Sequence, residues 1–133
     1  MTLVKTIELK NLGDDRGGLV AIEGNNTTPF PIKRVYYIYG TKLNVARGFH
    51  AHRDLQQLAV CVAGTCTMVL DDGGKKEEVV MGAPTQGVLI EAMVWHQMHS
   101  FSKDCVLLLL ASEHYDESDY IRDYGEFLKE VSP

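Results

Sequence analysis

Short apolar or alternating stretches, separated by turn-forming residues, fill most of this chain. Their spacing of about 8–12 residues is typical of an antiparallel sandwich or barrel and unlike that of a parallel α/β sheet. Segment 75–81 changes from polar to apolar and predicts an edge strand, whereas segment 104–112 is apolar enough to be buried on both faces. We expect strands over residues 6–10, 19–23, 33–39, 47–52, 57–62, 65–70, 75–81, 88–91, 95–101 and 104–112.

Only the C-terminal tail has helical periodicity. Ser118 or Asp119 is suited to cap a helix, and apolar side chains recur after them at helical spacing. This stripe is expected to pack against the outside of the barrel or against a partner subunit. Its members are Tyr120, Ile121, Tyr124, Phe127, Leu128 and Val131.

Composition narrows the class of protein. The 133 residues suit one domain over 1–133, and the net charge of −5 argues against a nucleic-acid binder. No apolar run reaches the roughly 18 residues that span a bilayer, so no membrane partner is expected. The three cysteines are odd in number and lack CxxC spacing. Together with an N-terminus unlike a signal peptide, this predicts a cytoplasmic protein whose cysteines are buried small hydrophobes.

The histidine strand Arg47–His52 carries the clearest chemical signal. His50 and His52 are two residues apart, so a β conformation places both imidazoles on one face. We expect that face to line the barrel cavity, with His96 nearby. Histidines titrate near neutral pH, and two of them in one cavity can move a proton between adjacent carbons.

Metal binding is the alternative for the same residues. Gln57 follows His52 by five residues and Gly64 comes seven later, which is the spacing of the first metal motif of cupin barrels, with His96 as a third histidine. Glutamine stands where the motif has a glutamate ligand. An amide is a poorer ligand and removes one negative charge. We therefore favour proton transfer and expect no metal.

Arginines and tyrosines around the strand suggest an anionic ligand. Arg47 lies three residues before His50, so strict alternation turns it away from the cavity unless Gly48 forms a bulge. Arg34 and Arg16 are further candidates for binding phosphate, which arginine contacts in a bidentate manner. Tyr36 shares a face with Arg34, whereas Tyr37 takes the other, and either ring could stack on a base or a sugar.

The chain resembles the cupin-fold nucleotide-sugar 3,4-ketoisomerases (WxcM-like), which act on thymidine-diphosphate-linked 4-keto-6-deoxyglucose. The Arg-Gly-Phe-His run is also similar to the Arg-Gly-Leu-His of rhamnose-pathway 3,5-epimerases, where the arginine holds diphosphate and the histidine is the base. The resemblance covers nearly the whole chain. It rests on residues 15–17, 29–38, 47–52, 94–98 and 110–122.

The resemblance implies an all-β fold, a small jelly-roll-like cupin barrel with a C-terminal helix, that needs neither metal nor cofactor. It implies acid and base work for His50 and His52, and a homodimer with strands exchanged between subunits. Arg53 stands where relatives often have a phosphate-binding lysine. The residues expected to contact a dTDP-linked keto sugar are Arg16, Arg34, Tyr36, Tyr37, Arg47, Arg53 and His96.

The pair Arg16 and His96 resembles the galacto-forming branch, whose product feeds 3-amino-3,6-dideoxygalactose synthesis for cell-surface glycans. A metal-dependent cupin dioxygenase and a non-catalytic domain that binds sugar nucleotides are the alternatives. The residues alone leave open which histidine is the base, which nucleobase is bound and which configuration carbon 4 acquires.

Overall fold

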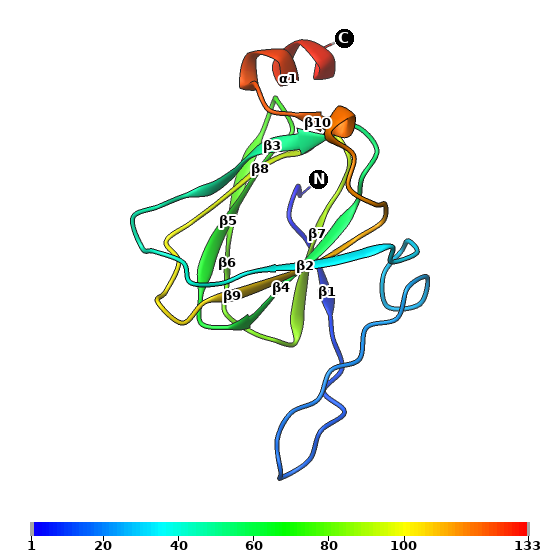
Figure 1. The fold of residues 1–133 in the computed structure, drawn as a ribbon, viewed down its shortest axis with the longest axis vertical. Helices are drawn as coiled ribbons and strands as arrows, with labels where there is room; N and C mark the ends of the chain where they lie inside the picture. The colour runs from blue at the N-terminus through cyan, green and yellow to red at the C-terminus, as the bar shows by residue number, and fades with distance from the viewer. Residues whose placement is uncertain (1, 133) are drawn as a thin grey trace.

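Two five-stranded antiparallel sheets face each other and form a barrel (Figure 1). The computed structural model describes residues 2–132. The first sheet has the order β1-β7-β4-β9-β2 and the second the order β10-β3-β8-β5-β6. The predicted all-β barrel with a C-terminal helix is confirmed. Its strands are β1 (Lys5–Glu8), β2 (Arg34–Ile38), β3 (Arg47–His52), β4 (Gln57–Ala63), β5 (Cys66–Asp71), β6 (Lys76–Met81), β7 (Gln86–Ile90), β8 (Trp95–His99), β9 (Val106–Ala111) and β10 (Tyr120–Ile121).

The core lies between the sheets and on the outer face of the first one. Strand β9 sits between β4 and β2, where Leu107 and Leu109 point into the barrel and Leu110 points outward into a second apolar cluster. This explains its continuous apolar run and confirms burial on both faces. Strand β6 is an edge strand, as its polar start predicts.

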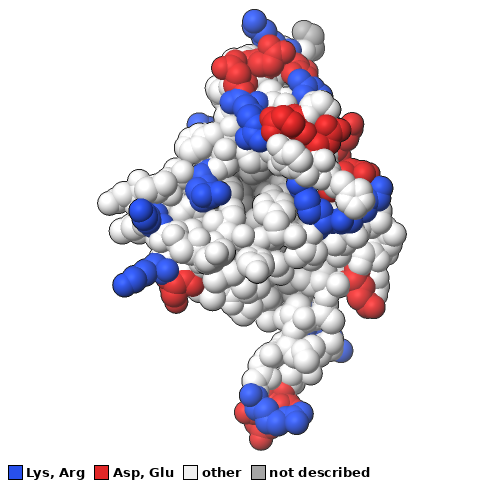
Figure 2. Space-filling view, in the orientation of Figure 1, with Lys and Arg blue, Asp and Glu red and all other residues white. Residues whose placement is uncertain are grey.

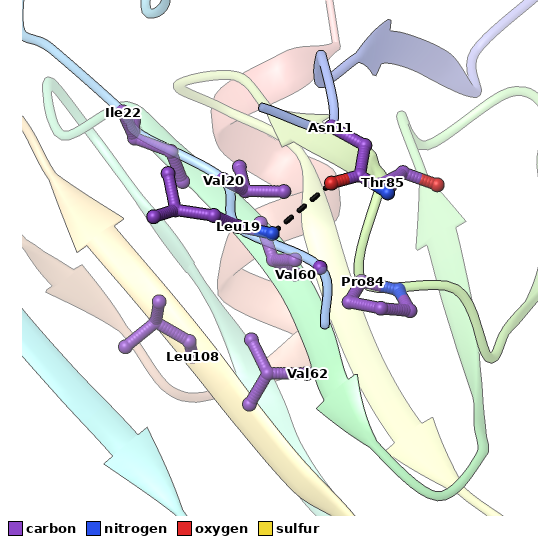
Figure 3. Close-up of a pocket in the computed structure, with 10 residues that line it drawn as sticks. Asn11, Leu19, Val20, Ile22, Val60, Val62, Pro84, Thr85 and Leu108 are labelled. Carbon is purple, nitrogen blue, oxygen red and sulfur yellow. Dashed lines mark hydrogen bonds between the residues drawn. The ribbon is translucent and has the colours of Figure 1, made fainter. Parts of the chain in front are cut away.

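Segment 19–23 was expected to be a strand, and this prediction is wrong. Val20 and Ile22 pack on the outer face of the first sheet, while Leu19 is 55% exposed. The side chains therefore alternate as in a strand. The backbone, however, lies over a sheet face instead of beside a sheet edge, so it joins no ladder. Figure 3 shows this segment above Val60 and Leu108, with an apolar groove of about 470 Å³ between them.

The C-terminal helix begins later than the periodicity suggests. Tyr120 and Ile121 form β10, which pairs with His52 and Ala51 of β3. Ser118 and Asp119 belong to a 3₁₀ turn, Glu117–Asp119, and neither caps the helix. The helix α1 (Tyr124–Val131) is capped by Asp123, whose carboxylate accepts the backbone N–H of Glu126. Pairing with β3 outweighs helical propensity at residues 120 and 121 because it completes the sheet.

Helix α1 packs against the end of the second sheet formed by β10 and β3 (Figure 1). Phe127 is fully buried and packs in one cluster with Trp95 and Ile121. The expected packing of the helical stripe against the barrel is thereby confirmed. The helix holds β10 against the end of β3, which is the end that carries the histidines. No helix among the described residues is long and apolar enough to cross a membrane.

Candidate active site

Three histidines meet at one end of the barrel interior. His50 and His52 come from β3, and His96 is the direct cross-strand partner of His50 on β8. The ring centroid of His50 lies 4.4 Å from that of His96 and 4.9 Å from that of His52. The structure thus brings together the three histidines that the sequence singled out. Each ring offers a nitrogen within 4.8 Å of the others.

The three rings differ in their exposure to solvent. His52 and His96 are 2% and 1% exposed, whereas His50 is only half-buried. Both ring nitrogens of His50 are without a hydrogen-bond partner among residues 2–132. His50 is therefore the least buried ring of the three, although its two nitrogen atoms are themselves shielded from solvent.

A β-bulge sets the direction of the arginine that precedes the histidines. Gly48 and Phe49 have φ values of +96° and +61°, and the β3–β8 register shifts between Gly48 and His50. Arg47 is thereby opposite Met98 and His50 opposite His96, so Arg47 and His50 share a face of the strand. A side chain at position 48 would come within 2.8 Å of the His96 carbonyl oxygen, which explains the glycine. The bulge anticipated at Gly48 is confirmed.

Burial makes all three imidazoles reluctant to accept a proton. It lowers the pKa of His50, and it lowers the pKa of His52 and of His96 to about 3. The neighbouring imidazoles add to the effect on His52 and His96, because a positive charge on one ring disfavours a second. In the free protein at neutral pH the cluster is consequently uncharged, which is the form that can act as a base.

Asp119 and Tyr120 complete the cluster from the C-terminal segment. A carboxylate oxygen of Asp119 lies 3.3 Å from Nδ1 of His52, and the Tyr120 ring is 4.3 Å from the His52 ring. On the third ring, Nδ1 of His96 is 3.2 Å from the carbonyl oxygen of Val94. Sequence reasoning missed Asp119 and Tyr120 because it assigned them to the start of a helix. The Tyr120–Asp119 pair lies outside any motif around the histidines, so only the β10–β3 pairing reveals it.

Strand β2 contributes an arginine and a tyrosine to the same cavity. Arg34 and Tyr36 are partly buried, and the Tyr36 hydroxyl donates to Oε1 of Gln57. The Arg34 charge lowers the pKa of His52, and its buried Nε is unpaired among the described residues. Tyr37 lies on the opposite face and is 61% exposed. The alternation predicted for this strand is confirmed, and it leaves Tyr37 outside the cluster within one chain.

Two of the predicted arginines lie away from the histidines. Arg16 belongs to the loop after β1, which projects from the first sheet (Figures 1 and 2), and it pairs with Asp14 at 2.5 Å. Arg53 pairs with Glu130 at 2.9 Å and donates to the carbonyl oxygens of Ser118 and Tyr120. Arg53 thus ties the Asp119–Tyr120 segment and helix α1 to the end of β3.

The same end of the barrel is open to solvent. Figure 2 shows a hollow below helix α1 with Lys and Arg side chains on either side of it. A pocket of about 610 Å³ includes Asp119, Tyr115 and His114 in its wall. Asp119 is therefore next to both His52 and this pocket.

The cluster matches only part of the donor set of a metal-binding cupin. His50, His52 and His96 could each supply one nitrogen to an ion. The fourth position is the buried amide of Gln57, whose oxygen already accepts a hydrogen bond from Tyr36. Four neutral donors provide no charge to balance a divalent cation. The side chains of this cluster therefore do not fit the complete metal site of a cupin.

The fold and the buried histidine cluster are those of a cupin-type barrel enzyme. The family model FdtA (WxcM-like, C-terminal) matches residues 2–132, and the chain belongs to this family. The curated TDP-4-oxo-6-deoxy-alpha-D-glucose-3,4-oxoisomerase of Aneurinibacillus thermoaerophilus is 51% identical over 128 residues, which are 96% of this chain and 92% of the relative. The resemblance noted from the sequence is confirmed, and the chain is an enzyme of the 3,4-ketoisomerase class.

Solved structures agree on the fold. A 3,4-ketoisomerase from Helicobacter canadensis superposes with a TM-score of 0.95 at 41% identity, covering 98% of both chains. A His-to-Asn variant of the 3,4-ketoisomerase QdtA from Thermoanaerobacterium thermosaccharolyticum, in complex with TDP-4-keto-6-deoxyglucose, gives 0.95 at 39% identity and covers 98% of this chain and 96% of that one. The TDP-quinovose 3,4-ketoisomerase WlaRB from Campylobacter jejuni gives 0.92 at 42% identity, covering 97% and 99%. The predicted cupin-type barrel is confirmed.

Proposed function

We propose that this protein converts TDP-4-keto-6-deoxyglucose to the 3-keto isomer by moving a proton between carbons 3 and 4 with its histidine cluster. The observation that carries the proposal is the uncharged cluster of three imidazoles, in which His50 is the least buried ring and has two nitrogens unpaired among the described residues. The 51% identical oxoisomerase supports the choice of substrate.

His50 is the base in this proposal. The 4-keto group acidifies the hydrogen on carbon 3, and neutral His50 removes that proton to leave an enediolate. The proton of the 3-hydroxyl passes to the 4-oxygen of the enediolate, a proton is delivered to carbon 4, and the carbonyl group appears at carbon 3. The two electrons of the carbon–hydrogen bond stay within the sugar, so the reaction is an internal shift without an external oxidant or reductant.

Positive charge near the cluster stabilises the enediolate. Arg34 is partly buried with an unpaired Nε, and its guanidinium lies 5.2 Å from the Tyr36 ring centroid. A cation fixed in a cavity shielded from water stabilises a developing oxyanion far more than one in bulk solvent. His52, whose Nδ1 lies 3.3 Å from Asp119, is placed beside His50 to return the proton or to share the charge.

Arg47 is placed to bind the nucleotide diphosphate. It shares the strand face of His50 and is exposed at the mouth of the cavity. Arginine contacts a diphosphate through two parallel N–H groups. QdtA has been solved in complex with TDP at 40% identity to this chain, which supports a thymidine nucleotide as the bound group.

The substrate is tested by incubation with TDP-4-keto-6-deoxyglucose and NMR of the product. The expected product carries its carbonyl group at carbon 3 and a hydrogen at carbon 4. Unchanged substrate, with TDP still bound tightly, would instead favour a non-catalytic nucleotide-sugar-binding domain. Elemental analysis of protein purified without chelator tests the metal-dependent alternative, for which a stoichiometric iron, manganese or nickel content would be required.

The galacto configuration at carbon 4 is the second part of the proposal. His96 lies directly against His50, so the residue at this position affects the face of carbon 4 that receives the proton. A QdtA double variant with Tyr-to-Arg and Arg-to-His substitutions has been solved with TDP, and Arg16 and His96 are those residue types here. The double variant Arg16→Tyr, His96→Arg is expected to give gluco product; unchanged galacto product would refute the assignment. A 3-keto galacto sugar suits an aminotransferase of a deoxyamino-sugar pathway.

The third part of the proposal is a homodimer in which Arg16 of one subunit reaches the histidine cluster of the other. Within one chain the Arg16 loop projects away from the histidines, and its Leu12 and Leu19 are 53% and 55% exposed (Figure 1). A second subunit would cover these side chains and bring the arginine to a cavity.

Subunit complementation tests this arrangement. Arg16→Ala and His50→Asn variants, each with little activity, are mixed after reversible unfolding. If Arg16 acts on the partner, each mixed dimer has one intact site and about a quarter of wild-type activity returns. If Arg16 acts within its own chain, or only monomers form, no activity returns. Light scattering measures the dimer directly.

A further inference from the structure

The closed end of the barrel contains a cluster of three thiols that the isomerase reaction does not use. Cys61 lies near the end of β4, Cys66 begins β5, and Cys105 immediately precedes β9. All three are free, and each is 1% exposed. Their sulfur atoms all lie within 4.8 Å of one another. Three elements that are distant in sequence therefore converge on one point.

The sulfur spacing suits a shared metal ion. Sγ of Cys61 lies 3.8 Å from Sγ of Cys105. Metal–thiolate bonds of about 2.3 Å place two sulfur ligands roughly 3.7–4.0 Å apart in tetrahedral or trigonal geometry. A disulfide would require the same atoms to approach to about 2.05 Å. The pair is already at the separation of two ligands on one ion.

The donors around this point are soft. Met81 is the direct cross-strand partner of Cys66, so its thioether side chain projects from the same face of the sheet. Met81 is 2% exposed and belongs with the cysteines to one buried cluster. Thiolate and thioether donors select Cu(I), whereas structural Zn²⁺ sites use four Cys or His ligands. We propose that Cys61, Cys66 and Cys105 bind a single Cu(I) ion, with each coordinating thiol releasing its proton to solvent.

Access to the cluster is through two exposed turns. The β4–β5 turn at Gly64 and the turn before Cys105 cover the sulfur atoms, linked by hydrogen bonds between Ser102 and Thr65 at 2.9 Å in both directions. Gly64 has φ +67° and a side chain there would come within 2.3 Å of the Ser102 hydroxyl. Gly64, Ser102 and Asp104 lie in these turns, so local opening of the turns would give an ion a path to the thiols.

The thiol cluster is separate from the histidines. Leu70, the β5 residue paired with His96, is four residues from Cys66 along the strand. Four residues of β-strand span about 13 Å. Copper at the cysteines would therefore leave the reacting carbons of the sugar out of reach.

Anaerobic titration with Cu(I) in the presence of the chromophoric competitor bathocuproine disulfonate tests the proposal. The reduced wild-type protein should withdraw one equivalent of Cu(I) from the competitor. X-ray absorption of that complex should show a first shell of sulfur only. The proposal would be overturned if the protein failed to withdraw copper from the competitor. It would also be overturned by a first shell dominated by nitrogen, as expected for the histidines, or by uptake of Zn²⁺ but not Cu(I).

Variants locate the site. Cys61→Ala and Cys105→Ala should each weaken Cu(I) binding at least tenfold, because each removes one of three anionic ligands. Met68→Leu, which removes a fully buried sulfur elsewhere in the same core, is the matched control and should bind like wild type. Equal binding by all three variants would refute the assignment. The absorption spectrum of wild-type protein remains decisive if a variant fails to fold.

Discussion

The two ends of the barrel interior carry clusters of the same size and opposite character. At one end three imidazoles lie beside Arg34 and Asp119 under an open hollow, and at the other three thiols lie within the apolar core. Strand β4 connects them, with Gln57 at the histidine end and Cys61 at the cysteine end. Proximity of reactive side chains is thus common to both ends, whereas among the described residues a partly buried arginine beside the cluster is found only at the histidine end. The proposed proton transfer is therefore assigned to the histidine end.

Removing the least buried imidazole should have the largest effect. His50→Asn is expected to lower kcat by about 10²–10⁴, because His50 is the proposed base and the ring of the cluster nearest to solvent. Steady-state kinetics measures this effect. His114→Asn, which removes an exposed imidazole outside the cluster, is the control and should retain activity within about twofold. Wild-type turnover by folded His50→Asn would disprove its role as base.

Removing the charge of Asp119 should lower kcat less than removing His50. Asp119→Asn removes the charge 3.3 Å from Nδ1 of His52 while preserving the shape of the side chain. We expect kcat to fall roughly ten- to hundredfold with little change in KM, because orientation of His52 is lost and binding is not. Asp116→Asn, which alters the cap of the same 3₁₀ turn without touching a histidine, should change kcat much less. Equal losses in both variants would indicate a merely structural role.

Acid should destabilise the histidine end selectively. The pKa values of His52 and His96 are about 3 in the folded protein and 6.5 in the unfolded chain, so the unfolded chain binds more protons between these values. Their contribution to the free energy of unfolding is complete above pH 6.5 and is lost as pH falls toward 3. Denaturant unfolding across this range measures it.

A variant without the two buried imidazoles provides the comparison. His52→Asn, His96→Asn should show a smaller loss of unfolding free energy between pH 7 and pH 4 than wild type. The carboxylates titrate alike in both proteins, so the difference isolates the histidines. Parallel stability curves would contradict the burial argument.

Changes at the cysteine end should leave turnover nearly unaltered. The double variant Cys61→Ala, Cys105→Ala removes two core sulfur atoms and is expected to cost about 1–2 kcal/mol of unfolding free energy. Its kcat at 25 °C should remain within about twofold of wild type, since the reacting carbons are not in contact with this end. A hundredfold loss of kcat in the folded variant would abolish the functional separation of the two ends.

Features that depend on residues close together in the sequence were predicted correctly. Alternation placed Arg34 and Tyr36 on one face of β2 and Tyr37 on the other, and two-residue spacing put His50 and His52 together. Gly48 indicated a bulge because a glycine inside a strand often marks one. In the structure, a side chain at this position would come too close to the His96 carbonyl oxygen. These features depend on neighbours in sequence and on strand geometry.

Contacts between distant segments were not predictable in the same way. Residues 120 and 121 fit a helical stripe, but pairing with β3 makes them a strand and delivers Asp119 to His52. The odd number and spacing of the cysteines gave no sign that Cys61, Cys66 and Cys105 would meet. Segment 19–23 has the alternating pattern of a strand, but it packs on the face of a sheet instead of pairing with its edge. The sequence alone does not show where that face will be.

Turnover in deuterated water, with the 4-keto sugar nucleotide as substrate, tests the central claim most directly. NMR of the wild-type product should show the carbonyl group at carbon 3 with hydrogen or deuterium newly bonded to carbon 4, and deuterium exchange at carbon 3 of the substrate should disappear in His50→Asn. Unchanged exchange at carbon 3 in that variant would show that another group removes the proton, and the histidine mechanism would be contradicted.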